Sequence, residues 1–267
     1  MNKFNFNRFG KVVVRDLHSA YNLYGMSLLI MALVPAFMWL LGWAFKANEV
    51  AVFSRYNFIQ FMVILAAAIA PMKIYNSCNL SGKGNYFAML PATLGEKFWS
   101  MVLYSFVVSP LVVLVGAVAV DILLTLLPFG PFKEYIWQMP DWTYAIGGGF
   151  FGYTAGFNGF LMSIFKVLSI ASLYLFANTI FKKNKFIKTI LWLLLIGFVL
   201  TVIAVPIVSH IDWMENRGWL FKLAEWLKLK SEEQLVNLWH WTNIILNAVV
   251  TFLFSFFTYR RLKKMQY

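Results

Sequence analysis

The chain has 267 residues, of which 61% are hydrophobic, 19% aromatic and 13% charged. Soluble domains are about 45–50% apolar and about 25% charged, so this composition excludes an ordinary soluble protein and predicts lipid around much of the surface. The formal net charge is +12, but the basic residues stand between apolar runs. This spacing favours membrane topology over nucleic-acid binding as the reason for the charge.

The first predicted element is an amphipathic helix within residues 1–23. At about 100° per residue, apolar and basic side chains fall on opposite faces, a pattern typical of a helix that lies in the headgroup layer. A basic leader that only sets the topology is the alternative. The apolar face holds Phe6, Phe9, Val13 and Leu17, and the basic face holds Arg8, Lys11, Arg15 and His18.

Six apolar runs follow, each long enough for the roughly 20 helical residues that a bilayer crossing needs. The third carries Pro110, which predicts a tilt, a kink or a projection past the membrane. The expected fold is therefore all-α: a polytopic integral membrane protein with one transmembrane domain, residues 1–267. The expected spans are about 24–45, 56–75, 98–127, 157–181, 186–209 and 238–258.

Lysine and arginine are concentrated on the side of the membrane that holds both termini and the connection between the second and third spans. The positive-inside rule therefore predicts that both termini are cytoplasmic. On that topology Trp219–Lys230, whose tryptophans and leucines share one face, forms an amphipathic helix on the outer surface. It is either an external gate or a simple anchor.

The connection after the second span contains an ordered stretch, Tyr86–Ser100. Thr93 and Glu96 have the spacing of a capping box, and Pro91 disfavours helix just before them. A helix is therefore predicted to begin near Leu94 and to run directly into the third span. The apolar residues ahead of it predict either a docking element or a loop that rests on the membrane.

The nine residues LPATLGEKF, Leu90–Phe98, resemble the cytoplasmic loop of export-type (type-2) ABC transporter permeases. The layout of six spans, an N-terminal interfacial helix and an outer amphipathic helix is similar too. The resemblance implies a cytoplasmic coupling helix that docks on a separate ATP-binding subunit. The residues at or beside that contact would be Tyr86, Phe87, Met89, Leu90, Thr93, Glu96 and Lys97.

The same resemblance implies a transport subunit of the bacterial inner membrane that is not itself an enzyme. It would act as a homodimer or as a heterodimer with a second permease, surrounded by membrane lipid and without nucleic acid. ATP and magnesium would bind to the partner subunit. In the chain itself, Ser81–Gly84 only partly matches the sequence of a phosphate-binding loop and follows an apolar span, so no nucleotide site is predicted there. The transported substrate is not readable.

Other candidate sites are weak. His18, His210 and His240 are scattered in the sequence and predict no metal site. Cys78 is the single cysteine, so an internal disulfide is excluded. The glycines around 147–159 favour close helix packing or a re-entrant turn over phosphate binding.

Two charges fall inside expected spans, Asp121 and Lys166. Charges in the bilayer core are costly and are usually paired or face a cavity. The two residues are at similar expected depths, so they either form an intramembrane pair or extend independently to the outer interface.

Three other functions stay open. An ion-coupled secondary transporter would need several buried acidic groups, and Asp121 is the one acidic residue within the expected spans. An intramembrane enzyme would need a polar catalytic cluster at one depth. A polytopic protein that transports nothing is the third alternative.

Overall fold

The computed structural model describes residues 4–47, 49–79, 89–136, 156–210 and 232–265. Within these ranges every regular element is a helix, as expected. Six helices are long and apolar enough to cross a membrane, so each predicted apolar run corresponds to one of them. These are Phe6–Ala44, Val52–Ile74, Leu94–Thr125, Leu161–Ile180, Lys185–Val202 and Asn237–Lys264.

The first of these helices has two parts, α1 (Phe6–Ala32) and α2 (Val34–Ala44). The predicted boundary between a surface helix and a span at Tyr24 is not observed, because α1 passes through this position without a break. The interruption comes at Leu33 instead, just before Pro35. A proline lacks the N–H that would reach back to Met31, so the helix changes direction there.

The second span is α3 (Val52–Ile74), followed by the short 3₁₀ helix η1 (Asn76–Asn79). The third span consists of α5 (Leu94–Leu103), a π-helical turn η2 (Tyr104–Val108) and α6 (Ser109–Thr125). Within η2 the N–H of Ser109 donates to the carbonyl of Tyr104, five residues back. The next residue is Pro110, which has no N–H to donate. The helix is locally widened just before this proline, a feature that the sequence analysis did not predict.

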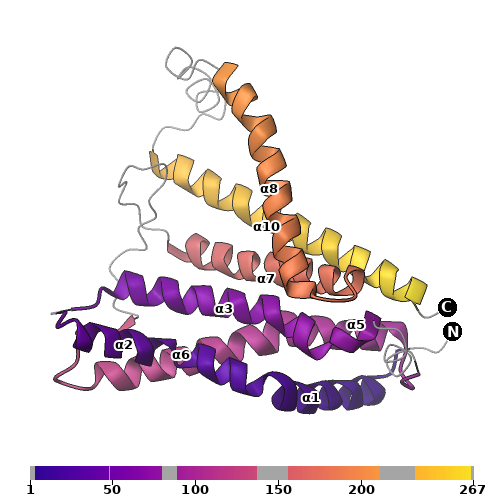
Figure 1. Cartoon of the computed structure of the whole chain (residues 1–267), viewed down its shortest axis with the longest axis horizontal. Coiled ribbons are helices and arrows are strands. Elements are labelled where there is room, and N and C mark those ends of the chain that lie inside the picture. The colour runs from indigo at the N-terminus through magenta and orange to yellow at the C-terminus, as the bar shows by residue number, and fades with distance from the viewer. Residues whose placement is uncertain (1–3, 48, 80–88, 137–155, 211–231, 266–267) are drawn as a thin grey trace.

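The remaining spans are α7 (Gly156–Ile180), α8 (Lys185–His210) and α10 (Glu232–Met265). Figure 1 shows α3 between the α1–α2–α6 group and α7, with α10 along the other side of α7. Helix α8 diverges from this bundle, and its residues 191–202 are all exposed. The predicted helix Trp219–Lys230 and the glycines before 156 lie outside the described residues.

Small residues allow close packing at the centre of the bundle. Ala66, Ala67 and Ala70 of α3 are fully buried. Where α1 crosses α6, a Cβ added to Gly116 would lie 2.9 Å from the Cβ of Ala32. Small side chains at such contacts let helix backbones approach in a lipid environment, where burying apolar surface gains little.

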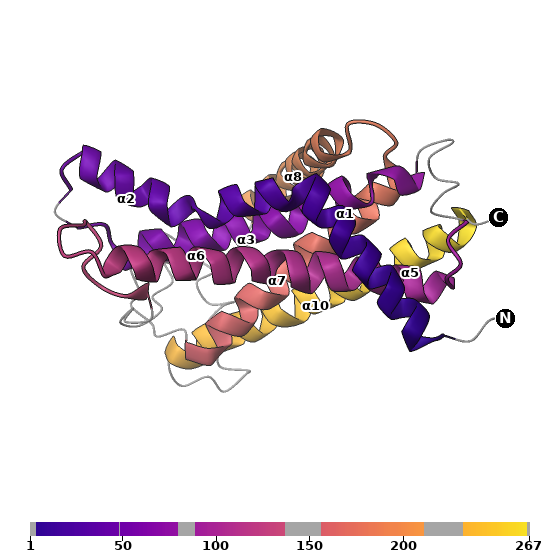
Figure 2. The same ribbon diagram turned by 90° about the horizontal axis from the view of Figure 1, so that it is seen from below.

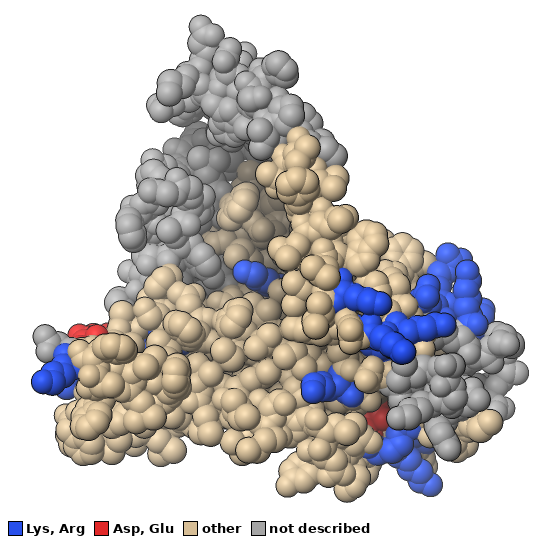
Figure 3. Space-filling view, viewed as in Figure 1, with Lys and Arg blue, Asp and Glu red and all other residues tan. Residues whose placement is uncertain are grey.

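Both termini lie at the same end of the bundle (Figures 1 and 2). We call this the terminal end; α3 and α7 end there, and α5 and α8 begin there. The opposite end, where α2 ends and α3 begins, is the far end. Lysine and arginine gather over the terminal end in Figure 3. Those that are exposed there are Lys11, Lys73, Lys182, Lys183, Lys188, Arg260, Arg261, Lys263 and Lys264.

Candidate functional site

The start of α5 has the predicted capping box. The N–H of Glu96 donates to Thr93 Oγ1 at 3.3 Å, and the N–H of Thr93 donates to Glu96 Oε2 at 2.8 Å. Each residue therefore satisfies a backbone donor that the first helical turn would leave unpaired. The prediction of a helix that begins at Leu94 and continues into the third span is confirmed.

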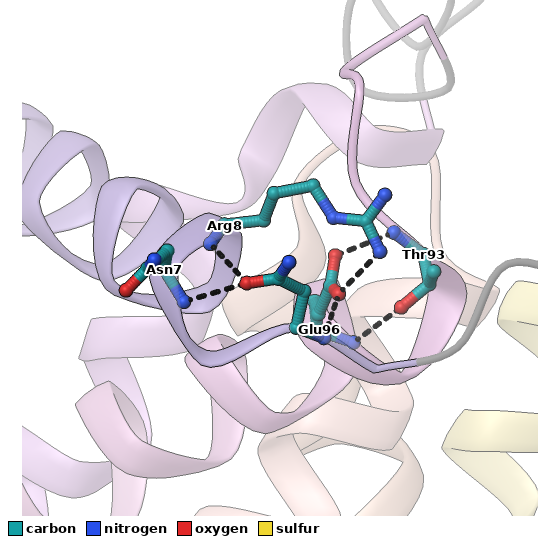
Figure 4. Close-up of polar contacts among 5 residues, drawn as sticks. Asn7, Arg8, Thr93 and Glu96 are labelled. Carbon is teal, nitrogen blue, oxygen red and sulfur yellow. Dashed lines mark hydrogen bonds and ion pairs between the residues drawn. The ribbon is translucent and has the colours of Figure 1, made fainter.

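Glu96 also joins α5 to the beginning of α1, as Figure 4 shows. Its Oε1 accepts hydrogen bonds from the backbone N–H of Asn5 at 2.7 Å and from Arg8 Nη2 at 3.0 Å. The Asn5 side chain in turn caps α1 by accepting from the N–H groups of Asn7 and Arg8. One carboxylate thus fixes the N-termini of two spans to each other, a joint that we call the Glu96 joint.

The other residues predicted at this contact are divided between surface and interior. Met89 is 78% exposed and Leu90 is half-buried, so both can meet a partner. Glu96 and Lys97 are buried, so their side chains can lie only beside the predicted contact and not on its surface. The reason is that the capping box turns Glu96 towards α1. Tyr86 and Phe87 lie outside the described residues.

Asp16, a residue that the sequence did not single out, joins three elements at the terminal end. Its Oδ2 accepts from Ser100 Oγ of α5 at 2.6 Å and from the Tyr75 hydroxyl at 2.9 Å. Its Oδ1 accepts from Arg15 Nε at 3.0 Å. Burial and the neighbouring Asp16 carboxylate both raise the pKa of Tyr75, which stays a neutral donor.

A second polar layer joins η1, α7, α8 and α10 at the same end. The buried Lys185 Nζ donates to the carbonyl of Asn76 at 2.7 Å and to Asn178 Oδ1 at 2.8 Å. The carbonyl of Thr179 accepts from Asn79 Nδ2 at 2.8 Å and from Arg261 Nε at 3.0 Å. These contacts satisfy the carbonyl groups at helix C-termini, where no further turn supplies an N–H.

At the far end, Asp121 pairs with Arg55 of α3. Arg55 Nη1 donates to the two carboxylate oxygens of Asp121 at 2.9 and 3.0 Å, and neither side chain has exposed surface. Arg55 Nη2 donates to the carbonyl of Glu134, and the guanidinium carbon lies 4.2 Å from the centre of the Phe132 ring. Of the two alternatives that the sequence left open for these residues, the intramembrane pair of Asp121 with Lys166 is therefore wrong.

The error has a simple cause. The expected second span begins at residue 56 and leaves Arg55 outside it, whereas α3 begins at Val52 and brings Arg55 beside α6. Lys166 has an exposed side chain on α7 and forms no ion pair within the described part of the chain.

The described residues include no group of three histidine, cysteine, aspartate or glutamate side chains that could hold a metal ion. His240 is buried on α10, and Cys78 is buried in η1. The polar side chains described above join helices to one another, and the Met89 side chain beside the Glu96 joint is exposed.

Comparisons with known proteins found no similar sequence or structure. No family model matches the chain, and neither a curated protein nor a solved structure is similar to it.

Proposed function

We propose that this chain is the membrane-spanning permease subunit of an ATP-driven exporter of the ABC type. It moves a substrate across the bacterial inner membrane, with both termini and the whole terminal end in the cytoplasm. A separate ATP-binding subunit hydrolyses ATP with magnesium, and two permease subunits, identical or different, form the pathway between them. In this arrangement the start of α5 is the coupling helix.

The observation that carries the proposal is the Glu96 joint. A partner that pushes on the segment before α5 moves a helix that continues into the third span. The same movement reaches α1 through the bonds from Glu96 to Asn5 and Arg8. Charge-assisted hydrogen bonds of this kind are short and strong, so one contact with an ATPase drives two spans together.

The contact surface that we propose is smaller than the resemblance implies. Met89 and Leu90 supply exposed apolar surface for the ATPase, with Tyr86 and Phe87 as their neighbours in sequence. Thr93, Glu96 and Lys97 act behind this surface: the first two cap α5 and the third is packed inside. Binding energy at an interface is concentrated in a few apolar side chains, and Met89 is the first candidate.

The charge distribution supports the proposed orientation. The exposed basic side chains of the terminal end have the placement that the positive-inside rule gives to cytoplasmic surfaces. In this orientation the amphipathic first turns of α1 lie at the headgroup level of that side. The helix then continues without a break into the membrane.

An ion-coupled transporter fits the described residues less well. Asp16, Glu96 and Asp121 are buried acids in membrane-crossing helices, but each carboxylate pairs with an arginine. A carboxylate that carries a proton or ion through a transport cycle needs a water-filled cavity to exchange with. These three are engaged in contacts between helices instead.

The test is co-purification with an ATP-binding subunit, which is to be sought among the products of the neighbouring genes. Met89→Asp places a charge in the proposed contact and should reduce ATPase recovery about tenfold or more at equal membrane abundance. The matched control is Phe129→Asp, since Phe129 is similarly exposed at the far end. Full recovery with Met89→Asp, or equal loss with both variants, would contradict the proposed coupling helix.

A further inference from the structure

A groove of about 390 Å³ opens at the terminal end between the last turn of α3 and the first turn of α8. Ile69, Met72 and Lys73 of α3 line one side, with Asn76 at its end. Asn184, Lys185, Phe186 and Ile187 line the other side. Polar and basic side chains therefore stand at the helix ends, and apolar side chains lie one turn deeper along α3.

The basic lining distinguishes this groove from a second groove of similar volume. The second groove, of about 400 Å³ between α2 and α3, is lined by apolar side chains and backbone alone, among them Phe37, Leu41 and Met62. Lipid tails fill such a surface without any selectivity. The groove between α3 and α8 needs an occupant with both an apolar and an anionic part.

The floor of the groove holds a buried cation. Lys185 is 5% exposed, and its ammonium donates to one backbone carbonyl and one side-chain amide. Among the described residues no carboxylate forms an ion pair with it. A buried charge is costly without a counter-charge, and an anion in the groove would supply one.

The rim adds further positive charge. Lys73 lines the groove and is exposed, and Lys188 follows one helical turn after Asn184 on the same face of α8. Lys182 and Lys183 are exposed in the turn just before. The acidic residues described at this end are Asp16 and Glu96, and both are buried in contacts with arginine. No described carboxylate at this end therefore competes for these lysines.

We infer that this groove is a binding site for an anionic phospholipid of the leaflet at the terminal end. The lipid phosphate lies between Lys73 and Lys188 above Lys185, and an acyl chain follows Ile69 and Ile187 towards the bilayer centre. Basic pockets between membrane helices at a cytoplasmic surface bind anionic headgroups in this way. The bound lipid fills the space between α3 and the otherwise weakly attached α8, and so it holds α8 against the bundle.

The inference does not depend on the exporter proposal, and lipid binding tests it directly. Delipidated full-length protein is titrated with short-chain phosphatidylglycerol or phosphatidylcholine, and bound lipid is counted by native mass spectrometry. We expect saturable binding with a preference of about tenfold or more for phosphatidylglycerol. Equal binding of the two lipids would overturn the proposal.

Two double variants with equal loss of charge locate the site. Lys73→Gln with Lys188→Gln should weaken phosphatidylglycerol binding roughly 30-fold, which is about 1 kcal/mol for each lysine. Lys263→Gln with Lys264→Gln removes two exposed charges from the end of α10 and should leave binding unchanged. Equal weakening by both variants would show a general charge effect and would overturn the site.

Soluble glycerol 3-phosphate distinguishes a lipid from a free phosphate. It has the anionic group but no acyl chain, so we expect it not to displace the lipid. Ile187→Ala, at the apolar side of the groove, should weaken lipid binding several-fold while the lysines remain in place. Full displacement by glycerol 3-phosphate, or unchanged binding by Ile187→Ala, would exclude a lipid as the occupant.

Discussion

Each buried acid in the described spans faces an arginine: Asp16 faces Arg15, Glu96 faces Arg8 and Asp121 faces Arg55. The planar guanidinium offers five N–H donors, so one arginine can satisfy a carboxylate and a backbone carbonyl together. Arg55 does this with Asp121 and Glu134.

The Asp121–Arg55 pair is the most buried of the three, which makes it the sharpest test at this scale. Asp121→Asn should lower the free energy of unfolding by about 3–5 kcal/mol, because it leaves a buried guanidinium without its counter-charge. Adding Arg55→Met should restore much of this loss. Denaturant titration of the purified protein in detergent measures both.

The control for that pair uses the residue expected from the sequence. Asp121→Asn combined with Lys166→Met should show strictly additive losses in the free energy of unfolding. The reason is that Lys166 is exposed on α7 and does not pair with Asp121. A coupling with Lys166 as large as that with Arg55 would contradict the observed pairing.

At the scale of elements, small residues let the helices approach one another closely at their crossings. Gly116 of α6 is the clearest case, because its added Cβ would meet Ala32 of α1 at 2.9 Å. Both are backbone-proximal atoms, so relief requires the helices themselves to separate.

Gly116→Ala should therefore destabilise the protein by about 1–3 kcal/mol, the usual cost of overpacking. Gly197→Ala on α8 is the matched control, since an added Cβ there meets no atom within 4 Å. Its effect should stay within about 0.5 kcal/mol. Thermal unfolding of the two variants decides this, and equal stability would show that α1 and α6 are not in close contact.

At the scale of the whole molecule, the sequence predicted what is local. The apolar runs and the capping box at Thr93 each depend on residues within a few turns of the chain. The partners of Asp121 and Glu96 depend on which helices become neighbours, and a separation of 88 residues between Arg8 and Glu96 leaves no local signal. The boundary of the second span was the other source of error, because Arg55 lies within the bundle only if α3 begins at Val52.

The proposed orientation gives a prediction for the whole chain. Cysteines introduced at Lys263 and Phe129 should react with a membrane-impermeant maleimide from opposite sides, the former from the cytoplasm and the latter from outside. Native Cys78 should stay silent, because burial raises the pKa of its thiol and the thiolate is the reactive form. Labelling of both positions from one side would overturn the orientation.

The π-helical turn before Pro110 has a consequence for the phase of the third span. Such a turn holds one residue more than an α-helical turn, and one residue corresponds to about 100° of rotation. Glu96 meets Arg8 before this extra residue, and Asp121 meets Arg55 after it. Deleting Phe106 would make the span a regular helix. It would also rotate Asp121 by about 100° relative to Glu96, so that both acids could no longer face their arginines. The extra residue therefore sets the rotation of the second half of the span relative to the first, so that Glu96 and Asp121 each face their own arginine.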